Sequence, residues 1–198
     1  LGTDLTRAWQ GAGNMTSFVC PFDVTSSVTI FSVTWYNCSS LISFPLLDTS
    51  SATNVSNAWF SCTSLTSFPE LNTSSGALFA SSWQNCNSLT SFPLLNTSSG
   101  QSFDYAWAFC SSLSDFPANM FDTTGTLSAT AFNNAWINCA LTAQSIENIL
   151  VSLDTNGTTG ITLGINGGTN AAKTTWSAAA VTAYDNLITK GWTISFNA

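Results

Sequence analysis

Six cysteines and ten carboxylates are the residues of this chain that could carry out chemistry, because the sequence contains no histidine. The lack of histidine removes the commonest general base and metal ligand, and with it every Ser/His/Asp or Cys/His arrangement. The chain has no Cys-x-x-Cys pair that would suit zinc and no D-x-D-x-D-G loop that would suit calcium. The sequence therefore predicts no metal site and no cofactor.

Carboxylate pairs deserve a separate test, since a glycosidase needs only two of them, about 5 to 9 Å apart. Asp23 and Asp48 follow the same segment in adjacent copies of a repeat, and Glu70 lies near Asn72, which is the equivalent of Asp48. Asp48 occupies a position that Asn fills in other copies, so the repeat explains it without catalysis. We expect no catalytic residues and no enzymatic activity.

A repeat of 24 residues dominates the first two thirds of the chain. Its motif is W-x-x-C-x-S-L-x-S-F-P-x-L-[DN]-T-S-S. An earlier copy begins around Trp9, and a later one with Trp136 follows a five-residue expansion, which makes six copies within residues 1–139. The repeated positions include Trp35, Trp59, Trp83 and Trp107, and Cys38, Cys62, Cys86, Cys110 and Cys139.

The cysteines share one position of this repeat, with the exception of Cys20. Equivalent side chains of stacked repeats point the same way about 4.8 Å apart, whereas a disulfide needs converging Cβ vectors. We expect a buried row of reduced thiols, with one or two bridges as the alternative. For Cys20, which lies in an irregular segment, a free thiol, an intermolecular bond and a plain buried thiol all stay open.

Each repeat is expected to open with a short helix, because an apolar residue precedes the Trp by four positions and the Cys follows it by three, as in Val55, Trp59 and Cys62. The L-x-S-F segment suits a strand, which the proline should end, and D/N-T-S-S suits a turn. Such a unit buries its apolar face only by stacking on neighbours. The fold class predicted is an α/β solenoid, leucine-rich-repeat-like, with a parallel sheet on one face and short helices on the other.

Residues 140–198 lack the 24-residue motif and have a different spacing of apolar residues. They are expected to form two longer helix-strand units that cap the array. Ile146, Ile149, Leu150 and Leu153 have helical spacing, and Ile161, Leu163 and Ile165 alternate. The same order recurs in a second helix with Val181, Tyr184, Leu187 and Ile188, and a last strand with Trp192, Ile194 and Phe196.

The C-x-S-L-x-S-F-P and D/N-T-S-S blocks resemble the short leucine-rich repeats of BspA-type bacterial surface proteins, which also occur in phage and other viral tail or fibre proteins. The resemblance covers Leu5 to Cys139, and Leu141–Ile146 with Gly167–Asn170 is similar to the C-terminal repeat pair that often accompanies such arrays. It implies a curved solenoid used for adhesion or recognition, generally without catalytic activity. Trp stands here where the family often has Phe.

Charge excludes two classes of partner. The chain has 3 Lys and Arg against 10 Asp and Glu, a net charge of -7, and no cationic side chain between Arg7 and Lys173. No basic patch exists to neutralise phosphates or to dock on anionic lipid, and no run of about 18 apolar residues could span a bilayer. Nucleic acid and membrane insertion are therefore not expected.

A binding surface is best sought at positions that differ among the copies, since the scaffold does not dictate them. The Trp row is a less suitable candidate for glycan stacking, because its apolar neighbours at helical spacing favour core packing. Extended faces of repeat arrays are their usual recognition surfaces, although the sequence does not say which row is exposed. The candidate binding positions are Ile42, Leu46, Thr66, Glu70, Thr90, Leu94, Ser114 and Ala118.

These observations predict a non-enzymatic extracellular binding or adhesion module, such as an adhesin or the receptor-binding part of a phage tail fibre, a virion appendage or a cell-surface protein. The expected partner is a host-surface protein or glycan. A larger polypeptide or a partner should also cover the N-terminal end, where Leu5 and Trp9 already occupy repeat positions. A passive structural or decoration protein, an ice-binding protein and a carbohydrate-active enzyme are the alternatives.

Overall fold

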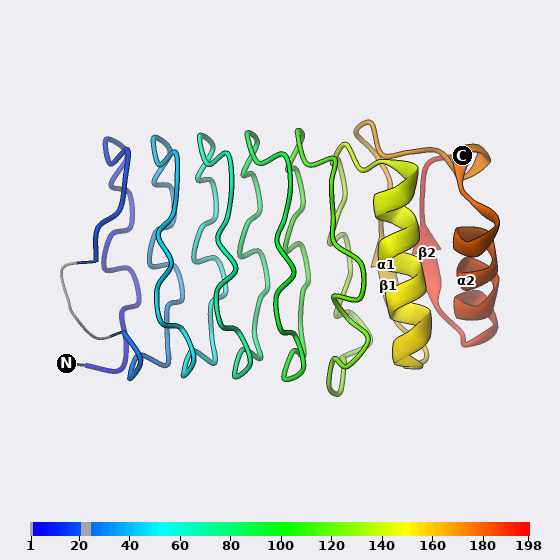
Figure 1. Ribbon diagram of the computed structural model, residues 1–198, viewed down its shortest axis with the longest axis horizontal. Helices are drawn as coiled ribbons and strands as arrows, with labels where there is room; N and C mark the ends of the chain where they lie inside the picture. The colour runs from blue at the N-terminus through cyan, green and yellow to red at the C-terminus, as the bar shows by residue number, and fades with distance from the viewer. Residues whose placement is uncertain (1, 21–24) are drawn as a thin grey trace.

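The computed structural model describes residues 2–20 and 25–198 of the chain. Successive copies of the 24-residue motif form coils of chain that lie side by side along the long axis of the molecule, and the helices lie at the C-terminal end (Figure 1). Single parallel bridges join neighbouring coils, among them Asn54 with Leu78 and Ser43 with Ser67.

The segment around each Trp is a run of turns rather than a helix. Asn57 and Ser61, two residues before and two after Trp59, have φ of 56° and 57°, and the other copies repeat this pattern. A right-handed helix needs φ near −63° at every residue, so these two positions interrupt it in each copy. The local hydrogen bonds are of the i→i−3 type: Ala58 N donates to Val55 O at 3.0 Å, and Cys62 N to Trp59 O at 3.1 Å.

The predicted α/β solenoid of leucine-rich type is therefore wrong. Within the part of the chain described, α-helix is confined to α1 (Ala143–Asn156) and α2 (Ala178–Thr189), with the short 3-10 helix η1 (Lys173–Thr175) between them. The only sheet there has two parallel strands, β1 (Thr162–Gly164) and β2 (Thr193–Ser195). Positive φ prevents the short helices, and the L-x-S-F segments make only isolated bridges before each proline.

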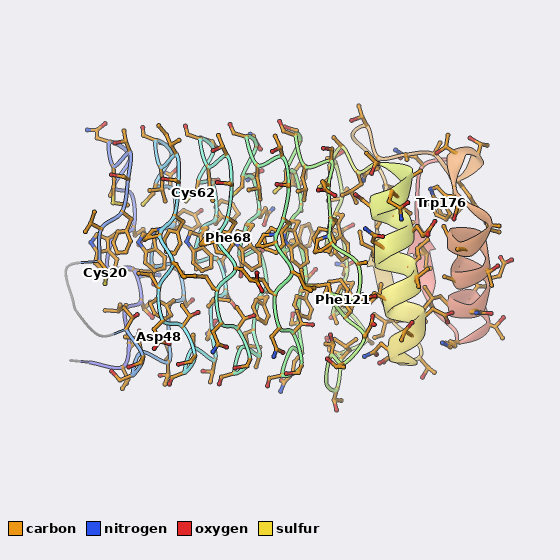
Figure 2. All side chains as sticks on the ribbon, in the orientation of Figure 1. Cys20, Asp48, Cys62, Phe68, Phe121 and Trp176 are labelled. Atoms are coloured by element: carbon orange, nitrogen blue, oxygen red, sulfur yellow. The ribbon has the colours of Figure 1, made fainter. Side chains whose placement is uncertain are left out.

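An aromatic core runs through the coils (Figure 2). Trp35, Trp59 and Trp83 stack with ring centroids 5.4 and 5.6 Å apart. Phe44 lies edge-on between two of them, 4.7 Å from Trp35 and 5.2 Å from Trp59. Its own neighbour in the Phe row, Phe68, is stacked at 5.8 Å. Offset-stacked and edge-to-face contacts at these distances are the arrangements that aromatic rings prefer.

The two helices expected after Cys139 are present. Thr142 caps the start of α1, where its side chain accepts a hydrogen bond from Ser145 N, and Gly157 ends the helix with φ of 81°. Ser177 caps α2 in the same way through Ala180 N. The strands that follow are shorter than the alternating patterns suggested, with three residues each.

Candidate functional site

The eight variable positions lie mostly on the surface. Seven are exposed, including Leu46 at 73%, Ile42 at 52% and Leu94 at 46%, while Ser114 is half-buried. Single exposed apolar side chains are common on protein surfaces, so what matters here is that these positions are accessible. The structure therefore places these positions where a ligand could reach them.

One row of these positions is held by the turn that follows each Phe-Pro pair. Phe44 is buried at one side of Leu46, and at the other side Asp48 Oδ1 accepts hydrogen bonds from Ser50 N at 3.0 Å and Ser50 Oγ at 2.7 Å. Asn72 Oδ1 repeats both contacts with Ser74 in the next coil. This is the side-chain turn that Asp and Asn favour, and it confirms the turn expected at D/N-T-S-S.

Buried threonines fasten these turns to one another. Thr49 Oγ1 donates to Asn72 O at 2.7 Å, and Thr73 Oγ1 donates to Asn96 O at 2.7 Å. Each threonine is at most 5% exposed, so its hydroxyl bonds the next coil and is not offered to a ligand. The turn therefore presents Leu46 and its equivalents from a rigid support.

We call the row of exposed residues after each Phe-Pro pair, Leu46, Glu70, Leu94 and Ala118, the Phe-Pro edge. Two grooves lie along it. The first groove has a volume of about 550 Å³ and is lined by Leu46, Leu47, Asp48, Ser50, Glu70 and Asn72. The second, of about 310 Å³, is lined by Glu70, Leu94, Leu95, Asn96, Thr97, Ser98, Asn119, Met120 and Thr123. Glu70 borders both grooves, which makes it the central side chain of the edge.

The first groove is lined by two carboxylates, those of Asp48 and Glu70. The hydrogen bonds from Ser50 lower the pKa of the Asp48 carboxyl below its ordinary value, so Asp48 is ionised at neutral pH. No Lys or Arg occurs between residues 8 and 172 to neutralise Asp48 or Glu70. A ligand with donors or a positive charge would meet uncompensated acceptors here.

Five of the eight candidates line neither groove: Ile42, Thr66, Thr90, Ser114 and Ala118. Thr66 Oγ1 donates to Ile42 O at 3.2 Å, and Ser114 Oγ donates to Thr90 O at 3.3 Å, so this row links coils through its hydroxyls. Ala118 is exposed but lines neither groove. Sequence reasoning missed Asn119, Ser98 and Thr123, which do line one. Their positions belong to turns, and the turn chemistry of Asn, Ser and Thr gives no separate signal of a ligand.

The Trp row is buried and cannot serve as a sugar-stacking surface in this fold. Trp35, Trp59, Trp83 and Trp107 are each 1% exposed. Their indole nitrogens, with that of Trp136, have no hydrogen-bond partner in the part of the chain described. The core packing expected for this row agrees with these burial values.

The thiols are also in the core, and all six cysteines are free. Each buried thiol donates to the backbone of the preceding coil: Cys62 Sγ lies 3.3 Å from Trp35 O, and Cys86 Sγ 3.2 Å from Trp59 O. Burial raises the pKa of Cys110 to about 12, so these groups are not thiolates at neutral pH and do not act as nucleophiles. Cys20 is half-buried.

The remaining expectations concern acids and metals. Asp23, considered above as a carboxylate partner of Asp48, lies outside the described residues. Among the residues that are described, no cluster of three or more Cys, Asp or Glu side chains is arranged to hold a metal ion, and none of the helices is long and apolar enough to cross a membrane. Comparisons with family models, with curated proteins and with solved structures found no match.

Proposed function

We propose that this chain is a non-enzymatic binding module on an exterior surface, and that the Phe-Pro edge contacts its ligand. The ligand would be a host-surface protein or glycan. The resemblance to BspA-type repeats suggests the setting, which is an adhesin, a phage or virion fibre, or a bacterial surface protein.

The observation that supports this proposal is the contrast between constant and variable positions on one stretch of backbone. Phe44, Phe68 and Phe92 are at most 7% exposed and occupy the same position in successive coils. Two residues further on, the side chains are Leu46, Glu70 and Leu94, all exposed. Packing fixes the buried Phe in each copy but leaves the exposed position free to vary between leucine and glutamate, and exposed faces of repeat arrays are their usual recognition surfaces. This variation beside a constant core position supports recognition at the edge.

A binding screen against glycans and host-surface proteins tests the proposal. We expect the triple variant Leu46→Ser, Glu70→Gln, Leu94→Ser to lose at least about tenfold in affinity, which corresponds to about 1.4 kcal/mol. Leu78→Ser is the matched control, because Leu78 is also an exposed leucine, 39% exposed, that lines neither groove.

Two results would count against this function. Equal losses in the triple variant and in Leu78→Ser would assign binding to another face. Absence of any ligand for the intact protein across a broad screen would favour the passive structural role. Unchanged unfolding curves for both variants are required before either result is interpreted.

A further inference from the structure

The Phe-Pro edge places an acid between two leucines on three successive coils. Leu46, Glu70 and Leu94 occupy the same position of the repeat. Glu70 borders both grooves, whereas Leu46 borders the first and Leu94 the second. A ligand that spans both grooves therefore meets Glu70 at its centre and a leucine on either side.

No cation of this chain neutralises Glu70. Lys and Arg are absent from residues 8–172, and the salt bridge found in the described part of the chain joins Lys190 to Asp154 in the C-terminal units. A ligand that covers Glu70 removes water from its carboxylate, and a desolvated charge is costly unless it is paired. A Lys or Arg side chain of the ligand would offset this cost through a charge-assisted hydrogen bond, whereas an anionic ligand would add repulsion.

The spacing of the coils indicates the conformation of such a ligand. In the Phe row, two residues before the edge, ring centroids are 5.8 Å apart from Phe44 to Phe68 and again from Phe68 to Phe92. One turn of an α-helix rises about 5.4 Å, whereas side chains on one face of an extended strand repeat at about 6.4 to 6.8 Å. Across three coils a helix therefore stays closer to the register of the edge than a strand does.

We propose that the ligand of the Phe-Pro edge is a helical protein segment with a cationic side chain between two apolar ones, at positions i, i+4 and i+7. These positions lie on one face of a helix, about one turn apart. The central Lys or Arg pairs with Glu70, and its aliphatic stem and the two apolar side chains cover Leu46 and Leu94. This inference rests on the proposed function and narrows its ligand to a basic amphipathic helix.

A display library tests this ligand class with the full chain as the target. The library presents a stable helical scaffold in which only positions i, i+4 and i+7 of one exposed face are randomised. We expect selection to enrich Lys or Arg at i+4 and apolar residues at i and i+7. A second library carries three randomised positions at i, i+2 and i+4 of a β-hairpin, and its best members should bind more weakly than the selected helices.

Charge reversal at the edge gives the sharpest comparison. Glu70→Lys should weaken binding of the selected helices by about tenfold or more, and a new selection against this variant should enrich Asp or Glu at i+4. Asp115→Lys is the matched control, because Asp115 is also an exposed acid but lines neither groove. This control changes the net charge by the same amount and should alter the affinity by no more than about twofold at physiological salt.

The outcomes separate this inference from the proposed function. Absence of binders, selected helices without a cation at i+4, or tighter binding by a hairpin would overturn the ligand class. Equal effects of Glu70→Lys and Asp115→Lys would also overturn it, because net charge alone would then explain the attraction.

The proposed function survives these results if another ligand, such as a glycan, loses affinity in the triple variant Leu46→Ser, Glu70→Gln, Leu94→Ser. Selected helices that bind this triple variant with full affinity would place recognition on another face and would overturn both.

Discussion

The coils and the C-terminal units fill the same cross-section of the molecule by different means. In the coils, residues 2–20 and 25–139, the core consists of stacked Trp and Phe rings supported by turns. In the C-terminal units, helices supply aliphatic side chains such as Ile149 and Leu153, both fully buried. Parallel contacts between successive chain segments continue across the boundary, where Phe132 pairs with Leu163.

The length of the repeating unit accounts for this difference between a core built on turns and a core built on helices. Asn54 pairs with Leu78, an offset of 24 residues, whereas Thr162 pairs with Thr193, an offset of 31. A helix of the size of α2, 12 residues, rises only about 1.5 Å per residue, while turns and extended chain cover more distance with fewer residues. The longer unit has room for a helix, and the 24-residue unit crosses the same core with turns and large aromatic side chains.

Polar side chains of α1 make the junction between the two regions. Ser145 Oγ accepts from Phe116 N at 2.9 Å, and Ser152 Oγ accepts from Phe121 N at 2.8 Å. Asn148 Nδ2 donates to Phe116 O at 2.8 Å. These contacts satisfy buried backbone groups of a coil that has no further coil beside it, so α1 completes the hydrogen bonding of the array as well as its apolar packing.

The largest effect is expected from removing residues 140–198. This deletion exposes the aromatic face of Trp136 and Phe132 and leaves the backbone groups that Ser145 and Ser152 satisfy without partners. We expect aggregation during expression or on heating, measured by light scattering. A soluble, monodisperse truncation with an unchanged melting temperature would show that the coils need no such cover.

Much of this organisation could be predicted from the sequence. The 24-residue period, the buried Trp and Cys rows and the two C-terminal helices follow from spacing and side-chain type. The conformation around Trp59 could not, because an i, i+4, i+7 apolar set is common to a helix and to this run of turns. Asn at some of these positions, such as Asn37, Asn57 and Asn85, is compatible with positive φ, but Val33 and Ser61 at equivalent positions give no such signal. The grooves depend on coil-to-coil distances that no sequence pattern specifies.

The next largest effect concerns Trp83, which is 1% exposed and stacks on both Trp59 and Trp107. We expect Trp83→Ala to lower the free energy of unfolding by about 3 to 5 kcal/mol. Trp83→Phe should cost clearly less, because it keeps an aromatic ring and removes an indole N–H that finds no partner in the described chain. Urea unfolding of both variants measures the difference. Full stability of Trp83→Ala with loss of ligand binding would instead make this row a recognition surface.

The thiol row should make the coils sensitive to alkali. Burial raises the pKa of Cys110 from 9.0 to about 12 and raises those of Cys62 and Cys86 as well. The folded chain thus keeps protons that the unfolded chain releases, so stability present below pH 9 is lost as the pH rises toward 12. Each such thiol contributes a slope of about 1.4 kcal/mol per pH unit. Urea midpoints from pH 8 to 11 should fall less steeply in Cys110→Ala, and identical slopes would refute the assignment.

The smallest expected effect is the difference in stability between glycine and alanine variants, which should have opposite signs in the coils and in helix α2. Asn85 has φ of 63° in a coil, whereas Asp185 is exposed within helix α2. At position 85 glycine should be more stable than alanine by about 1 kcal/mol, because a Cβ is strained at positive φ. At position 185 alanine should be more stable than glycine by about the same amount, because glycine loses more backbone entropy in a helix. Unfolding of the four variants, Asn85→Gly, Asn85→Ala, Asp185→Gly and Asp185→Ala, gives both differences. If alanine were the more stable residue at both positions, the coil would be helical around its Trp and the distinction between the two regions would fail.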